Sequence, residues 1–176
     1  VLPLIAAWLI GLAIAIGVGS TLFHTFATRW AMILDIVPIL VFQLVFLWLY
    51  LVRVARLPPW MATLATCAFL AVALAAREIK EPLNGSVPYI PALLVVGGLG
   101  LYHFLRCEQE RSILFAAAGA FVLALLFRTI DMDVCGTFPR GTHFLWHLLI
   151  ATAIYLSARA LILNQPLGAA TEGVSA

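Results

Sequence analysis

The amino-acid sequence predicts an all-α fold, a polytopic helix bundle that crosses a membrane. Of its 176 residues, 64% are hydrophobic and 10% are charged, against about 45–50% and about 25% in soluble domains. The apolar residues form continuous runs, whereas a membrane β-barrel would show short alternating segments. Composition therefore excludes a soluble enzyme, a disordered chain and a nucleic-acid-binding protein.

Six apolar segments approach the roughly 20 residues that a helix needs to cross a bilayer core of about 30 Å. They cover residues 1–23, 33–52, 60–76, 88–105, 112–127 and 141–163. The fifth segment is short and must take length from its flanks. We therefore expect a transmembrane helix-bundle domain over residues 1–163 and a disordered tail over residues 164–176, where Gly, Ala and Ser are frequent.

Local signals support several of these segments. A Pro-Pro pair at residues 58–59 precedes the third segment, as prolines do at helix starts. Gly97, Gly98 and Gly100 of the fourth segment are typical of tightly packed membrane helices. Arg159 lies in the last turns of the sixth segment, from which its long side chain can extend to the membrane surface.

The distribution of Lys and Arg gives no membrane orientation. If side A is the face that carries the N-terminus and the helices alternate, five basic residues fall on each side. Side A receives Arg53, Arg56, Arg106, Arg111 and Arg159, and side B receives Arg29, Arg77, Lys80, Arg128 and Arg140. Because basic residues favour the cytoplasmic side, an equal split favours neither orientation.

Polar side chains inside or beside the apolar segments are functional candidates, since a membrane tolerates few of them. They are Ser20, His24, Asp35, His103, His143 and His147. The alternating topology places all of them except His103 on side B, although they come from three segments. His103 lies toward side A, and a structural role is expected for it.

The spacing of these residues predicts a metal site. His143 and His147 are four residues apart, so on a helix both imidazoles project from one face. His24 adds a third nitrogen, and three protein ligands with a fourth position open to water are typical of catalytic zinc. Asp35 would shuttle protons. Ser20, one turn before His24, would donate a hydrogen bond to a developing oxyanion.

Each of these residues also has a simpler interpretation. A pair of histidines at this spacing arises by chance, and Asp35 is explained equally well as the N-cap of the second helix, with Pro38 in its first turn. Ser20 is explained by a hydrogen bond to the carbonyl of Ile16, as is common for serines in membrane helices. The charged residues before the last segment are most simply a solvated loop: Asp131, Asp133 and Arg140.

Two motifs resemble the alkaline ceramidase family. They are Gly-Ser-Thr-Leu-Phe-His-Thr-Phe at residues 19–26, with Asp35 eleven residues after His24, and Gly-Thr-His-Phe-Leu-Trp-His at residues 141–147. The family belongs to a larger group of seven-helix membrane hydrolases that includes the progestin and adiponectin-type receptors and shares Ser-x3-His, Asp and His-x3-His. The resemblance covers about residues 12–156 and looks bacterial.

This resemblance implies an amidase that cuts the N-acyl bond of ceramide to a sphingoid base and a fatty acid. It implies that His24, His143 and His147 hold Zn2+, that Ser20 assists the oxyanion, and that Asp35 is the general base and then protonates the leaving amine. The implied partners are the lipid bilayer and a ceramide-like substrate. The implied location is the bacterial inner membrane, with the zinc site near its non-cytoplasmic face.

One departure from the family concerns the start of the chain. Family members have seven spans, the first preceded by an acidic segment whose Glu and Asn residues form a calcium site. The sequence begins at Val1 without these ligands, so we expect a member that lacks the first span, with no support for calcium. The family's cysteine pairing would involve Cys135, but its N-terminal partner is absent.

Two other classes of function compete with the hydrolase. One is a receptor-like or sensor protein that keeps the zinc site for structure. The other is a small-solute or proton transporter, for which ionisable groups near the middle of the membrane are expected. Because the candidates here gather at one end of their segments, the transporter is the least favoured. The sequence sets neither the acyl-chain preference nor the oligomeric state.

Overall fold

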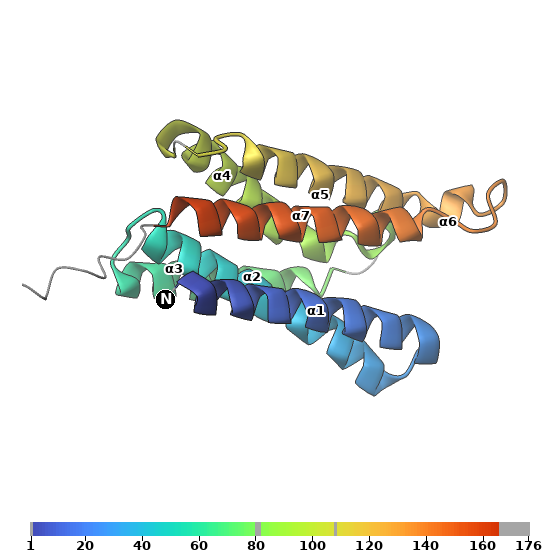
Figure 1. Ribbon diagram of the computed structural model, residues 1–176. Coiled ribbons are helices and arrows are strands. Elements are labelled where there is room, and N and C mark those ends of the chain that lie inside the picture. Colours follow the sequence, from blue (N-terminus) through green and yellow to red (C-terminus); the bar gives the residue numbers. More distant parts are fainter. Residues whose placement is uncertain (1, 80–81, 108, 166–176) are drawn as a thin grey trace, which may run out of the picture. The chain divides into compact units, whose positions relative to one another are not determined.

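The computed structural model describes residues 2–79, 82–107 and 109–165 (Figure 1). Regular structure within these ranges is entirely helical, which confirms the predicted all-α membrane fold. The long helices are α1 (Leu2–Phe26), α2 (Arg29–Arg53), α3 (Pro59–Ala76), α4 (Ile90–Arg106), α5 (Ile113–Thr129) and α7 (His143–Asn164). The short elements are the 3-10 turns η1 (Pro82–Gly85) and η2 (Val87–Tyr89) and the helix α6 (Asp131–Val134).

Five helices of the described chain are long and apolar enough to cross a membrane, so the chain is a multi-pass membrane protein. They cover Leu4–Phe26, Arg29–Arg53, Pro59–Ala76, Val87–Arg106 and His143–Asn164. The sixth apolar helix, α5, has 17 residues and falls short of this length, as its sequence indicates.

Helix ends differ from the sequence-based limits where the candidate residues lie. α1 continues to Phe26, so His24 is in its last turn. α2 begins at Arg29 after Thr28, which makes the interpretation of Asp35 as an N-cap wrong, since Asp35 lies in the second turn. Pro38 is likewise inside α2 rather than in its first turn.

The last helix begins and ends slightly later than the sequence predicts. α7 starts at His143 rather than at residue 141, and it runs to Asn164. The first residue of the expected disordered tail is therefore helical. Residues 166–176 of that tail lie outside the described residues.

The described chain divides into two compact units: the first covers residues 2–57 and 161–165, and the second covers the described part of residues 58–160. In the first unit, α1 and α2 lie side by side and antiparallel, in the two blue shades of Figure 1. Only Ala27 and Thr28 connect them, and Ala27 turns the chain with a positive φ of 50°.

A close backbone contact joins α1 to α2. Pro38 has no N–H, so the carbonyl of Leu34, four residues earlier, loses its helical partner. This carbonyl oxygen occupies the place where a Cβ of Gly19 would stand, and the backbone nitrogen of Asp35 is 3.1 Å from that place. The α-hydrogen of Gly19 therefore points at the Leu34 oxygen, a weak contact typical of close membrane helices.

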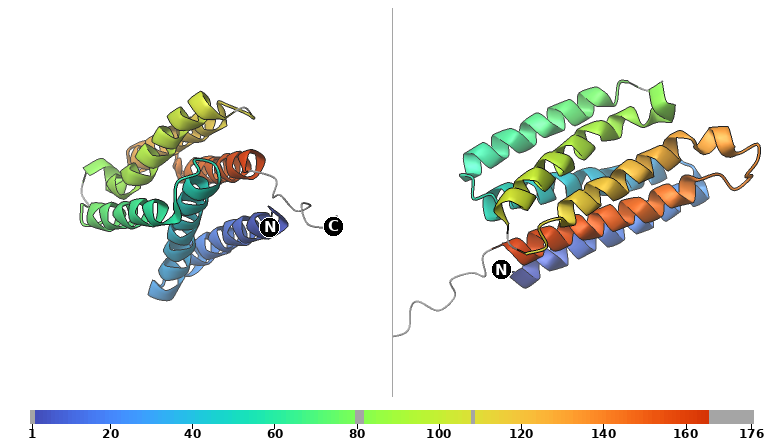
Figure 2. Two further views of the ribbon diagram at one scale, coloured as in Figure 1. Left: turned by 90° about the vertical axis from the view of Figure 1, so that its left-hand side faces the viewer. Right: turned by 90° about the horizontal axis from the view of Figure 1, so that it is seen from above.

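In the second unit, α4 and α5 lie antiparallel side by side in all views (Figures 1 and 2). Gly100 makes this approach possible, because a Cβ there would lie 3.2 Å from the ring of Phe115. The tight packing predicted for the other two glycines of α4 is not seen, since Gly97 and Gly98 face open space. α3 packs on α4 and on η2.

Trp146 ties α7 to the rest of the second unit. Its ring is 6% exposed and lies 4.8 Å from the ring of Tyr89 in η2 and 6.4 Å from that of Phe121 in α5. The guanidinium of Arg128 lies over both Tyr89 and Trp146, at 5.1 and 5.3 Å from the ring centroids. These contacts fix the rotation of α7 at the residue beside His147.

The side chain of Arg159, which we expected to extend to the membrane surface, pairs with Glu110. Its Nε donates to both carboxylate oxygens of Glu110, at 3.1 and 2.8 Å, and its Nη2 also donates to Oε1. The pair is exposed and joins the last turns of α7 to the loop before α5. The hydrogen bonds from Arg159 hold the pKa of Glu110 below its ordinary value of 4.5.

This depressed pKa gives an acid-dependent contribution to stability. A carboxyl group with a lowered pKa in the folded state stabilises the fold above its unfolded pKa, and this contribution is lost as the pH falls through the folded pKa. We expect the thermal midpoint of the wild-type protein to fall more between pH 5 and pH 3 (roughly) than that of Glu110→Gln. The effect should be small and weaken with salt, because the pair is exposed. Equal pH profiles for Glu110→Gln and the control Glu78→Gln would contradict it.

Candidate metal site

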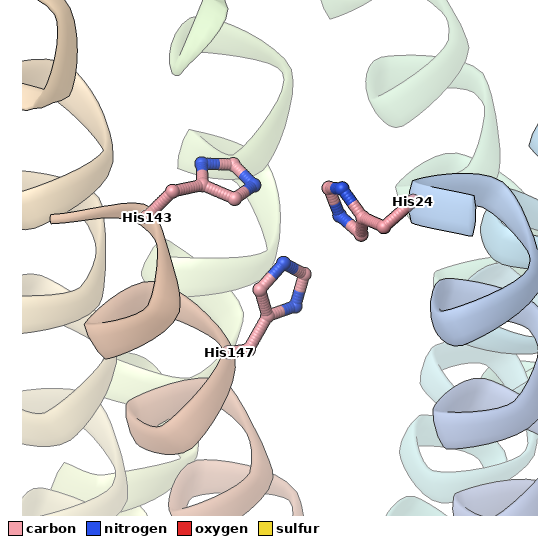
Figure 3. A group of neighbouring side chains, drawn as sticks. All are labelled: His24, His143 and His147. Atoms are coloured by element: carbon pink, nitrogen blue, oxygen red, sulfur yellow. The ribbon is translucent and has the colours of Figure 1, made fainter. Parts of the chain in front are cut away.

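Two histidines stand at the start of α7, one turn apart. His143 is the first residue of the helix and His147 follows four residues later. Their rings are 4.8 Å apart between centroids and are inclined at 75°, and both side chains are half-buried. The pairing that the spacing predicts is thus present within one helix, and Figure 3 shows both rings projecting from the same side of α7.

The backbone in front of α7 is held by Asp131, at the start of α6. Its Oδ1 accepts hydrogen bonds from the backbone N–H groups of Thr142 at 2.6 Å and His143 at 2.9 Å. Its Oδ2 lies 3.9 Å from Nδ1 of His143. Asp131 is therefore not part of a solvated loop, as its sequence position suggested, because its side chain is only 18% exposed.

Two further features fix this segment. Thr142 directs its hydroxyl to the carbonyl of Phe127 at the end of α5, at 2.6 Å. Gly141 has a φ of +61°, and Oδ1 of Asp131 fills the space of a Cβ. A residue with a side chain would therefore be strained at position 141 and would also collide with the carboxylate.

In the first unit, the other candidates lie where α1 and α2 meet. Ser20 and Asp35 are half-buried and directly follow Gly19 and Leu34, whose backbones are in contact. His24 is exposed in the last turn of α1, one turn after Ser20, and its ring is 5.7 Å from that of Phe23. The α1–α2 contact therefore places the two predicted catalytic residues at one level of the hairpin.

The three sequence-predicted metal ligands come from both units, His143 and His147 from the second unit and His24 from the first. His143 and His147 present their imidazole nitrogens from one side of α7, and two imidazoles one turn apart are a common pair of metal ligands (Figure 3).

The chemistry of these donors suits zinc. Three neutral imidazoles are ligands that zinc accepts readily, whereas magnesium and calcium prefer oxygen ligands. A carboxylate close to a ligating histidine is also a recurrent feature of zinc sites. The donor set therefore fits the metal that the sequence predicts, although copper and nickel also bind imidazole.

The remaining sequence candidates lie elsewhere. His103 in α4 is fully buried and its Nε2 donates to the backbone carbonyl of Gln109 at 3.3 Å, as expected of a residue with a structural role. Asp133 and Arg140 are exposed, in agreement with a solvated loop. The residue that sequence reasoning missed is Asp131. The only available signal was an acidic residue shortly before a helix start, which is too common to single it out.

Comparison of the chain with protein families, with curated proteins and with solved structures gives no match. The resemblance to the alkaline ceramidases therefore depends on the motifs around Ser20, His24, Asp35, His143 and His147 alone. What it implies for activity is treated below as a proposal.

Proposed function

We propose that the protein is a zinc-dependent amide hydrolase of the bacterial inner membrane, which cleaves the N-acyl bond of ceramide or a related N-acyl lipid. The products are a sphingoid base and a fatty acid. The observation that carries the proposal is the pair of histidines at the start of α7, His143 and His147, whose ring centroids are 4.8 Å apart. The motif resemblance supplies the substrate class.

In this proposal His24, His143 and His147 hold the metal through one nitrogen each. Zinc bound by three imidazoles supplies a Lewis acid and lowers the pKa of a coordinated water toward neutrality. The protein contributes the positions of the three ligands. His143 and His147 are fixed by the start of α7, and His24 by the last turn of α1.

Ser20 and Asp35 would act on the amide itself. The hydroxyl of Ser20 donates a hydrogen bond to the carbonyl oxygen of the scissile amide as this oxygen gains negative charge. Asp35 accepts the proton of the attacking water and then delivers it to the leaving nitrogen, so that the amine departs neutral. Both residues directly follow Gly19 and Leu34, where the backbones of α1 and α2 are in contact.

An apolar substrate fits the surroundings of these residues. Phe144 and Leu148 flank the histidines of α7 and are 48% and 61% exposed. Phe26 and Trp30 beside the end of α1 are 55% and 51% exposed. In a membrane-spanning chain such side chains face lipid. A two-tailed lipid can therefore approach from within the bilayer without leaving it.

The test is hydrolysis of ceramide by the purified protein in lipid nanodiscs. Ceramide with a labelled acyl chain should release labelled fatty acid, and a zinc chelator should abolish the release. Added zinc should restore it. The variant Asp35→Asn is expected to lower the rate by about 10²–10⁴-fold while retaining zinc, because it removes the acid–base group but not a ligand.

Asp133→Asn is the matched control for Asp35→Asn, since Asp133 is exposed and takes no part in the proposed site. It should hydrolyse ceramide at the wild-type rate. If the purified protein binds one zinc ion per chain but hydrolyses no ceramide of any chain length, the hydrolase proposal is refuted and the receptor-like alternative is favoured.

A further inference from the structure

The carboxylate of Asp131 takes no part in the roles assigned so far, yet it is the most constrained acidic group near the histidines of α7. It comes from the short helix α6, twelve residues before His143. Its side chain is 18% exposed, and it accepts two backbone hydrogen bonds at the start of α7. A carboxylate whose only role was to be solvated would not need these two backbone hydrogen bonds.

Asp131 replaces the ordinary N-cap of α7. The residue before a helix usually caps it with its own side chain, and Thr142 is well suited to this. Here the Thr142 hydroxyl donates instead to the carbonyl of Phe127. The carboxylate of Asp131 instead accepts hydrogen bonds from the backbone N–H groups of Thr142 and His143 at the helix start, where the helix dipole also favours negative charge.

This capping decides where the second carboxylate oxygen lies. With Oδ1 tied to two backbone N–H groups, Oδ2 is 3.9 Å from Nδ1 of His143. A rotation that brings the two about 1 Å closer gives a hydrogen bond of ordinary length. Gly141 contributes by leaving room for the carboxylate, since a Cβ at this position would overlap Oδ1.

We propose that Asp131 is a positioning residue for His143: its carboxylate accepts the Nδ1–H of the imidazole and so directs Nε2 to the metal. Histidines that bind metals usually donate their other N–H to such an acceptor, which fixes the tautomer and the ring orientation. The proposal rests on the metal site of the proposed function, and it adds a residue to that site. Asp131 neither binds the metal nor contacts the substrate.

Two variants separate positioning from capping. Asp131→Asn keeps an oxygen that can accept the backbone N–H groups, but the amide group that then faces His143 cannot accept its Nδ1–H. Asp131→Ala removes both functions. Asp133→Asn is the control, because Asp133 lies in the same short helix, is exposed, and loses the same charge.

The measurement is the zinc affinity of the purified protein in detergent, by competition with a chromophoric chelator, together with the visible spectrum of the cobalt-substituted protein. We expect Asp131→Asn to bind zinc about 10–100-fold more weakly than wild type and to shift the cobalt bands. Its helix content and thermal midpoint should stay close to those of Asp133→Asn. Asp131→Ala should lose zinc affinity and thermal stability together.

The outcomes distinguish this inference from the proposed function. If Asp131→Asn and Asp133→Asn bind zinc with equal affinity and give the same cobalt spectrum, Asp131 only caps the helix and the positioning role is refuted. If the wild-type protein itself binds no zinc, the proposed metal site is refuted, and with it the role of Asp131 toward that metal.

Discussion

His143→Ala and His147→Ala should each remove bound zinc from the purified protein and abolish hydrolysis of ceramide. In the proposed site each of these residues supplies a nitrogen to the metal, and two remaining protein ligands are too few for a catalytic zinc site. A metal of this kind contributes several kcal/mol to transition-state stabilisation, which corresponds to a rate loss on the order of 10⁴-fold. Zinc content by elemental analysis and release of labelled fatty acid measure the two effects. His24→Ala should behave in the same way.

The control for these variants is Thr152→Ala on the same helix. Thr152 is exposed and its hydroxyl only donates to the carbonyl of Leu148 one turn earlier, at 2.9 Å. This variant should keep both zinc and activity. A His143→Ala protein that still carries one zinc ion per chain would show that the metal is bound elsewhere.

Gly19→Ala should be the most destabilising of the single-methyl additions considered. The new Cβ would overlap the carbonyl oxygen of Leu34, and because this is a backbone atom, no rotamer change can relieve the overlap. Overpacking of this kind costs about 3 kcal/mol or more, equivalent to a fall of roughly 6–12 °C in the thermal midpoint. Activity should fall as well, since Ser20 and Asp35 directly follow the two residues in contact.

Gly17→Ala is the matched control for this substitution. Gly17 lies in the same helix, two residues earlier, and a Cβ there would meet no atom within 4 Å. We expect its thermal midpoint to remain near that of wild type, or to rise slightly because alanine has the higher helix propensity. If both variants unfold at the same temperature, the close approach of α1 and α2 at Gly19 is not a constraint.

The helices were predictable because a bilayer imposes a long apolar run on each of them. All six apolar segments are helical, and their core limits follow from hydrophobicity alone. The ends were less predictable, because α1 and α2 continue into the polar flank around Arg29 and leave only Ala27 and Thr28 between them. Hydrophobicity marks where a helix meets the membrane surface rather than where its hydrogen bonds end.

Pro38 shows the consequence of misplacing the start of α2 in the sequence-based prediction. From the sequence it was placed in the first turn of α2, where its missing N–H would have no consequence. Inside the helix, the same residue releases the carbonyl of Leu34 toward Gly19. The pairing of a proline with a glycine on another helix depends on the register of α1 against α2. This register could not be predicted from the sequence alone.

The candidate site, like the helices, was only partly predictable from the sequence. The histidine pair of α7 was predictable because spacing within one helix determines which residues share a face. Asp131 was not, because its role depends on how the loop between α5 and α7 folds back on itself. Short-range patterns describe neighbours along a helix, whereas a carboxylate twelve residues before His143 reaches it only through the tertiary structure.

The closed loop from Asp131 to His143 has a practical consequence. One carboxylate ties its two ends together, and the loop tip at residues 136–140 is exposed throughout, so we expect insertions at the tip to leave the histidine in place. Exposed tips of this kind accept inserted peptides well. A short epitope or a protease site placed there would report from which face of the membrane the loop is accessible, and would thereby settle the topology that the basic residues, five on each side, leave undecided.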